Sequence, residues 1–143
     1  MTPEENKAIV LRLFDEVINT HKFHLAEQFV TSDLKRFDLC RLFPDREGSN
    51  AVNEHMTTWT QGVPDLRVDP VQVIAGEDCV TLRYLAHGTH SGELLGRPGT
   101  GKSLRLEGVN VYRLVDGKIA ETWQYLDGLS LLRQIGALPP EHT

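Results

Sequence analysis

The chain has 143 residues, about the length of one ordinary domain, and its 15 Lys and Arg against 20 Asp and Glu give a net charge of −5. With 40% hydrophobic and 24% charged residues it is too apolar for a disordered protein. No apolar run approaches the ~18 residues of a membrane-spanning helix, and no export signal opens the sequence. We therefore expect a single domain over residues 1–143, located in the cytoplasm and without a membrane partner.

The charged residues are scattered, and Arg97 and Lys102 are the nearest approach to a basic loop. Nucleic-acid binding needs a clustered basic face, so we expect no nucleic-acid partner. Cys40 and Cys79 are too few for a disulfide framework and lack the CxxC spacing of a metal site, so they are predicted to be small buried thiols.

Two histidine pairs invite a metal interpretation, which we reject. His87 and His90 lie three positions apart in a predicted strand and so point to opposite faces of the sheet. No Asp or Glu completes a ligand set near His21 and His24. The sequence predicts no metal site.

Helical periodicity dominates the first part of the chain. An amphipathic helix is predicted with Thr2 or Pro3 at its start and Glu4 and Glu5 in its first turn. Its apolar stripe comprises Ile9, Val10, Leu13, Phe14, Val17 and Ile18. A short helix is predicted over His24 to Val30, ending near Asp33, and a third from Ser49 or Asn50 to Gly62 and Pro64.

From Leu66 onward the period changes to two, which predicts an antiparallel meander of about four long strands. The predicted strands are Arg67 to Ala75, Cys79 to His90, Lys102 to Leu114 and Lys118 to Leu126. A last helix is expected from about Leu129 to Ile135, with Asp127 as its cap and Gly136 as its stop. The result is an α+β domain whose helices cover one side of a curled sheet.

The segment Gly96–Ser103 matches G-x-x-x-x-G-K-[ST], the pattern of a phosphate-binding loop. That loop must open a helix whose N-terminus faces the phosphates. Here Ser103 opens an alternating, strand-like pattern, and the chain shows no βαβ alternation. We therefore expect a hairpin loop and no nucleotide.

Several segments together resemble the SnoaL-like polyketide cyclase family in order and spacing. They are Asn6 to Asp15, Ser32-Asp33, Arg46 to Gly48, Pro64 to Leu66, Gly88 to Gly96, Tyr112-Arg113, Asp116 to Ile119, Glu121 to Asp127 and Leu131 to Gly136. The resemblance implies a cone-shaped α+β fold with a curved mixed or antiparallel sheet, N-terminal helices over its concave face and a short C-terminal helix. It also implies a deep apolar pocket and a homodimer packed through the sheet face.

The family's cyclases work without a cofactor, and the resemblance implies general acid/base chemistry on an activated methylene. The family's catalytic Asp corresponds to Gln124, which has no proton to trade near neutral pH. Its partner His corresponds to Asn110, its pocket Gln to Gly108 and its pocket Asn to Arg36. The fold is thus expected, while the usual aldol mechanism is placed in doubt.

Strand parity tests which residues share a face. With Val115-Asp116-Gly117 as a three-residue bulged loop, Asn110 lies across from Thr122 and Gly108 across from Gln124. Leu106, Tyr112, Ala120 and Leu126 then share that pocket face, opposite Val109, Val111, Trp123 and Tyr125. A two-residue turn at Asp116-Gly117 is the alternative and would separate Asn110 from Gln124. We favour the bulged loop.

The predicted catalytic residues are Asp38, Gln124, Asn110 and Arg36, and the predicted substrate-binding residues are Phe14, His55, Trp59, Tyr112 and Asp127. The competing interpretation of Asp38 is a loop cap or a surface charge, that of Asp127 is a helix cap, and that of the aromatic residues is a place in the core. Glu107 falls on the other face. The preferred function is a cofactor-independent enzyme of secondary metabolism acting on a polyketide-like or other small hydrophobic substrate, as cyclase, isomerase or hydroxylation-type enzyme. The alternative is a non-catalytic binding protein for a small hydrophobic ligand.

Overall fold

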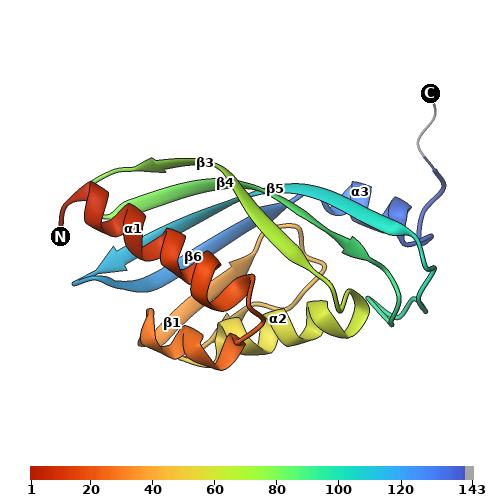
Figure 1. The fold of residues 1–143 in the computed structure, drawn as a ribbon, viewed down its shortest axis with the longest axis horizontal. Helices are drawn as coiled ribbons and strands as arrows, with labels where there is room; N and C mark the ends of the chain where they lie inside the picture. The colour runs from red at the N-terminus through yellow and green to blue at the C-terminus, as the bar shows by residue number, and fades with distance from the viewer. Residues whose placement is uncertain (141–143) are drawn as a thin grey trace.

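The computed structural model describes residues 1–140, which form one curved six-stranded sheet with helices packed on one side (Figure 1). The strands are β1 (Val30–Asp38), β2 (Arg46–Glu47), β3 (Arg67–Ala75), β4 (Cys79–Thr89), β5 (Ser103–Val115) and β6 (Lys118–Leu126). The helices are α1 (Pro3–Leu13), α2 (Ala51–Gly62), α3 (Gly128–Gln134), the π turn η1 (Phe14–Ile18) and the 3₁₀ helix η2 (Phe23–Gln28). The predicted α+β class is confirmed, and the sheet does not close on itself.

Helix α1 begins with a capping box, as its sequence suggests. The Thr2 hydroxyl accepts a hydrogen bond from the Glu5 backbone N–H at 3.1 Å, and the Glu5 carboxylate accepts one from the Thr2 N–H at 3.1 Å. The apolar stripe continues past Leu13 as the π turn η1, where the Asn19 N–H donates to the Phe14 carbonyl at 2.9 Å. The stripe as a whole faces the sheet, and Val10, Leu13, Phe14, Val17 and Ile18 are buried.

The strand order is β2-β1-β6-β5-β4-β3. Strands β3 to β6 form the predicted antiparallel meander, with bounds within one residue of those predicted. Strand β1 extends the sheet by pairing parallel to β6, and the short β2 pairs antiparallel to β1. The sheet is therefore mixed, with a parallel pair at the point where the N-terminal part of the chain joins the meander.

The prediction of a helix from His24 to Val30 is wrong in its C-terminal part. Only a 3₁₀ helix forms, over Phe23–Gln28, and Val30 already begins β1. Strand β1 alternates correctly, since Leu34, Arg36 and Asp38 are buried and Lys35 is exposed. Two of the three inward positions carry charged side chains, so the apolar alternation that marks a half-buried strand is absent from the sequence.

The turn between β5 and β6 also differs from the prediction. Asp116 and Gly117 form a two-residue turn with φ of 48° and 79°, and Val115 pairs with Lys118. A register shift between Arg113 and Leu114 then leaves Ala120 as an extra residue on β6. Turn and bulge together place Asn110 directly opposite Gln124, so the two predicted site residues are nearer neighbours than either register considered from the sequence allowed.

The remaining connections agree with their sequence signals. Asn50 precedes α2, Asp127 caps α3 through the Ser130 N–H at 3.0 Å, and Gly136 has a φ of 81° just beyond α3. The segment Gly96–Ser103 leads into β5, so it lacks the helix N-terminus that a phosphate-binding loop requires.

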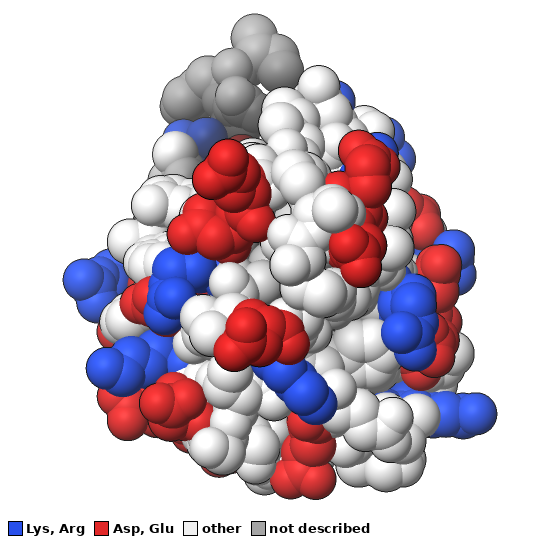
Figure 2. Space-filling model, turned by 90° about the vertical axis from the view of Figure 1, so that its left-hand side faces the viewer, with Lys and Arg blue, Asp and Glu red and all other residues white. Residues whose placement is uncertain are grey.

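The outer surface mixes both signs of charge. On the face shown in Figure 2, Lys and Arg side chains lie between Asp and Glu side chains and do not gather into a basic patch. Within residues 1–140, none of the helices has the length and apolar character that crossing a membrane requires.

Candidate active site

A pocket lies between the concave face of the sheet and the helices. Most of its wall is apolar and comes from α1, η1, α2 and the strands. The apolar lining residues are Leu13, Phe14, Ile18, Val30, Val52, Met56, Trp59, Leu66, Val68, Ala86, Ile119 and Leu126. Such a chamber suits a small hydrophobic molecule held by a few polar contacts.

The polar lining residues form a stripe across four neighbouring strands of the sheet. Arg36 of β1 is in register with Thr122 of β6, and Gln124 of β6 is in register with Asn110 of β5. The stripe continues through Tyr112 of β5 to Tyr84 of β4. The helices opposite add one polar side chain, His55 of α2. The sheet thus supplies most of the polar side chains of the pocket, and the helices supply mainly apolar ones.

Arg36 is the charged residue of this stripe and is only 5% exposed. Its Nη2 donates a hydrogen bond to Oε1 of Gln124, while its Nη1 is buried without a hydrogen-bond partner. Within the described part of the chain Arg36 forms no ion pair. Burial lowers the pKa of the guanidinium, and the negative charge of Asp38 opposes that shift. The group nevertheless stays a cation, because arginine does not lose its proton in proteins.

Asp38 lies two residues along β1 from Arg36 but does not line the pocket. Its Oδ2 accepts hydrogen bonds from the backbone N–H groups of Leu42 and Phe43 at 3.2 and 3.0 Å and from the Cys40 thiol at 3.2 Å. These contacts make Asp38 the anchor of the turn that follows β1. Of the two predictions for Asp38, the geometry fits the loop-capping one.

Cys40 is held in place by the hydrogen bond from its thiol to Asp38. Burial, with Asp38 adding to it, raises the pKa of the Cys40 thiol to about 11. Cys40 therefore remains a thiol at neutral pH and is a poor nucleophile.

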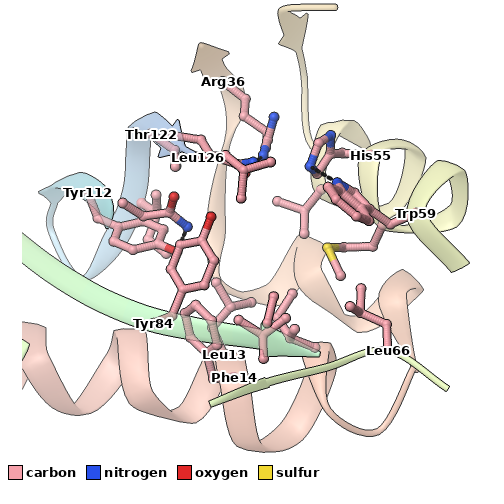
Figure 3. A pocket seen from close by; sticks show the side chains of 18 of the residues that line it. Leu13, Phe14, Arg36, His55, Trp59, Leu66, Tyr84, Tyr112, Thr122 and Leu126 are labelled. Atoms are coloured by element: carbon pink, nitrogen blue, oxygen red, sulfur yellow. Dashed lines mark hydrogen bonds between the residues drawn. The ribbon is translucent and has the colours of Figure 1, made fainter. Parts of the chain in front are cut away.

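His55 is buried and locked in one tautomer by its neighbour on α2. Trp59 Nε1, which can only donate, bonds to His55 Nε2 at 3.1 Å, so the neutral ring carries its proton on Nδ1. Nδ1 itself has no hydrogen-bond partner. Burial, followed by the charges of Arg36 and Arg46, holds the pKa of His55 well below 6.5. Figure 3 shows the His55 ring and the Arg36 guanidinium near one another at one end of the pocket.

Tyr84 owes its position to the glycine opposite it. It pairs with Gly108 in the β4–β5 ladder, and a Cβ at Gly108 would overlap the Tyr84 ring and hydroxyl. The hydroxyl is directed into the pocket beside Tyr112, as Figure 3 shows. Burial raises the pKa of Tyr112 to about 12 and also raises that of Tyr84, so both remain phenols at neutral pH. Tyr112 also accepts a hydrogen bond from Asn110 Nδ2 at 2.9 Å.

The structure brings most of the predicted site residues together. Seven of them line the pocket: Phe14, Arg36, His55, Trp59, Asn110, Tyr112 and Gln124. Asp127 does not, because its exposed side chain caps α3. Ala120 was predicted on the pocket face, but the bulge puts Ile119 there in its place.

Two polar lining residues were not among the predicted site residues: Tyr84, and Thr122, which strand parity had placed on the pocket face. Both carried a usable signal. Tyr84 shares the inward parity of Val80, Leu82 and Ala86, which are buried, and Thr122 lies two positions before Gln124. The space over Gly108 could not be seen without the register of β4 against β5.

The polar residues that line the pocket can donate hydrogen bonds, and one of them, Arg36, carries a positive charge. Among the described residues no Asp or Glu lines the pocket, so a carboxylate base is missing from its surface. The same part of the chain has no cluster of three or more His, Cys, Asp or Glu arranged to hold a metal ion. Arg36, His55, Tyr84 and Tyr112 can stabilise negative charge that develops on a bound molecule.

Comparisons with known proteins point to one family. A family model described as SnoaL-like polyketide cyclase matches residues 8–135. The aklanonic acid methyl ester cyclase DnrD of Streptomyces peucetius is 25% identical over 129 residues, which cover 89% of this chain and 88% of DnrD. The nogalonic acid methyl ester cyclase of Streptomyces nogalater is 32% identical over 72 residues, covering 50% of this chain and 54% of that one.

Solved structures give the same answer for the fold. AclR, a proposed hydroxylase from Streptomyces galilaeus, has a TM-score of 0.86 at 27% identity and covers 99% of this chain and 87% of its own. A proposed SnoaL-like polyketide cyclase from Jannaschia also has a TM-score of 0.86, at 24% identity, with 96% and 95% coverage.

Proposed function

The chain belongs to the SnoaL-like polyketide cyclase family, and from that premise we propose that it is a cofactor-independent enzyme of secondary metabolism acting on a polyketide-like substrate held in the pocket. Its relatives include cyclases named for methyl esters of polyketide acids, which supports an aromatic or polycarbonyl substrate of that kind. Among the reactions that the resemblance implies, intramolecular aldol cyclisation is the one we favour.

One observation carries this proposal: a buried cation with an unused donor lies in an apolar pocket. Arg36 is 5% exposed, and its Nη1 has no hydrogen-bond partner among residues 1–140. Charge stabilisation is strongest where water is excluded and donors are fixed before the reaction. An enolate oxygen is the kind of developing negative charge that such a donor favours.

The proposed reaction balances without a carboxylate base. A proton leaves the activated methylene for water at the pocket mouth, and the enolate oxygen lies against Arg36 and Gln124. The enolate carbon bonds to a ketone carbon of the same molecule. The resulting alkoxide accepts a hydrogen bond from Tyr84 and takes up a proton, so the product is an isomer of the substrate.

A binding protein is the second candidate, favoured by two observations. The resemblance puts Gln124 at the position of the family's catalytic Asp, and one oxygen of Asp38 is occupied by three donors. Under this alternative the polar stripe of the sheet would orient a ligand without transforming it.

A product analysis separates the candidates. The protein is incubated with polyketide acid methyl esters of the type named for its relatives, and the products are examined by liquid chromatography and mass spectrometry. Cyclisation gives a new compound of unchanged mass, and hydroxylation adds one oxygen atom. Recovery of tightly bound but unchanged ligand would favour the binding protein, and no binding at all would contradict both.

We also propose that the chain forms a homodimer through the outer face of the sheet. Phe37 and Trp123 stack there with ring centroids 5.8 Å apart, and Tyr125 is 51% exposed. Aromatic side chains of this kind are enriched in protein interfaces.

A further inference from the structure

The end of the pocket where Arg36 and His55 lie is positively charged, although the protein as a whole carries a net charge of −5. Arg36 lies within it and Arg46 close enough to depress the pKa of His55 together with Arg36. Arg46 forms a salt bridge with Glu54 at 3.2 Å, and the Glu54 side chain is 46% exposed. Asp38 is the carboxylate whose charge acts on Arg36, but the two form no salt bridge within the described residues. Asp38 Oδ2 accepts three hydrogen bonds, and its Oδ1 is buried without a hydrogen-bond partner there.

Among the described residues that line the pocket, two hydrogen-bond donors have no acceptor. Arg36 Nη1 is one, and His55 Nδ1, which carries the ring proton because Trp59 donates to Nε2, is the other. Both side chains are at least 95% buried and both line the pocket, from opposite walls. A buried donor without an acceptor is destabilising, and more so when it is charged. A ligand oxygen between the walls would remove that destabilising effect.

We propose that the pocket selects ligands that carry an anionic oxygen, a carboxylate or an ionised enol, and that this oxygen binds to Arg36 with His55 as a second donor. The inference rests on the proposed function only in using the same pocket. It goes beyond that function by placing the negative charge on the ligand before any reaction begins. A neutral ester of the same size should then be the poorer ligand.

Binding of three bicyclic probes tests this directly: 2-naphthoate, the ionised enol 2-acetyl-1,3-indandione, and the neutral methyl 2-naphthoate. Affinity is measured by titration calorimetry at pH 7, with quenching of tryptophan fluorescence as a second readout, since Trp59 lines the pocket. We expect at least one anion to bind about ten- to a hundredfold more tightly than the ester, because hydrogen bonds to charged groups contribute about 1.5–3 kcal/mol. Which anion shows the preference identifies the group.

Variants assign the preference to its residue. Arg36→Met should bind ester and anion equally, and Arg36→Lys should keep part of the preference because it keeps the charge. His55→Gln should reduce the preference less than Arg36→Met does. Arg97→Met, an exposed arginine outside the pocket, is the matched control and should behave as the parent protein does.

Equal affinity of the parent protein for ester and anions would overturn the inference. So would an anion preference that survives in Arg36→Met. Neither result touches the proposed function, which is judged by turnover of a polyketide ester. Conversely, a strong anion preference without any turnover would support the inference and count against the enzyme.

Discussion

Arg36 is a buried cation, and the part of the chain that the structure describes gives it no ion pair. Desolvation of a buried charge costs several kcal/mol, and replacing such groups by apolar side chains of similar volume is often neutral or stabilising. Its retention in an apolar chamber is most readily understood as a cost borne for binding or catalysis.

Stability of Arg36→Met tests that reading. We expect its free energy of unfolding to equal or exceed that of the parent protein by about 1–2 kcal/mol, because the buried charge is removed and the volume is kept. Urea denaturation measures it. A loss of more than about 2 kcal/mol would show instead that Arg36 holds the fold together.

His55 predicts a pH dependence of stability. Its pKa is well below 6.5 in the folded protein and returns to 6.5 on unfolding, so the unfolded state binds the extra proton. The stabilising effect of the neutral ring is complete above pH 6.5 and is lost as the pH falls toward the folded-state pKa. The unfolding free energy should fall by up to about 1.4 kcal/mol per pH unit in that window.

Denaturation of His55→Gln between pH 7 and pH 5 measures this contribution. The variant should show a shallower decline than the parent, and His24→Gln, which changes an exposed histidine, should leave the slope unchanged. Identical slopes in all three proteins would mean that His55 titrates normally when folded.

Tyr84 and Gly108 are cross-strand partners, and the Tyr84 ring fills the space that a side chain at Gly108 would need. Gly108→Ala should destabilise the protein by about 1–3 kcal/mol, because the new methyl group overlaps the Tyr84 ring. In Tyr84→Ala the same change should cost much less, since the ring is gone. A double-mutant cycle by urea denaturation measures this coupling.

Gly76→Ala is the matched control for that cycle, because a Cβ there has its nearest neighbour at 3.7 Å, an ordinary contact. It should be close to neutral. Additive effects of Gly108→Ala and Tyr84→Ala would contradict the proposed packing.

At the scale of elements, the parts of the fold with a regular apolar period were predictable. Strands β3 and β6 match their predicted bounds, and α3 has its predicted cap and stop. Strand β1 was not, because Arg36 and Asp38 occupy inward positions where an apolar residue would signal a strand. Arg36, which lines the pocket, and Asp38, which anchors the following turn, therefore hide from sequence analysis the strand that carries them.

The register of β5 against β6 shows a second limit. Parity alone placed Asn110, Tyr112, Gln124 and Leu126 on the pocket face, and they line the pocket. Which residues lie opposite one another depends on the turn and on the bulge at Ala120, and two such features can compensate. The face of each residue was therefore predictable except at the bulge, where Ile119 replaces Ala120, and the cross-strand partners were not predictable.

At the scale of the whole molecule, the concave side of the sheet holds the pocket and leaves the outer side for assembly. We expect a homodimer in solution, measured by light scattering after size exclusion. Tyr125→Glu should convert it to a monomer, because a buried carboxylate in the interface lacks a partner. Leu129→Glu, which changes a 52% exposed residue on α3 and not on the sheet, is the control. A parent protein that is monomeric at all concentrations would contradict this arrangement.

The central claim is that Arg36 stabilises negative charge on a substrate inside the pocket. The most direct measurement is kcat for cyclisation of a polyketide acid methyl ester by the parent protein, Arg36→Met and the Arg97→Met control. We predict that Arg36→Met lowers kcat by about a hundred- to a thousandfold, as loss of a single charge-stabilising donor does elsewhere, while Arg97→Met is unchanged. An Arg36→Met protein that is folded and turns over substrate at the parent rate would contradict the account.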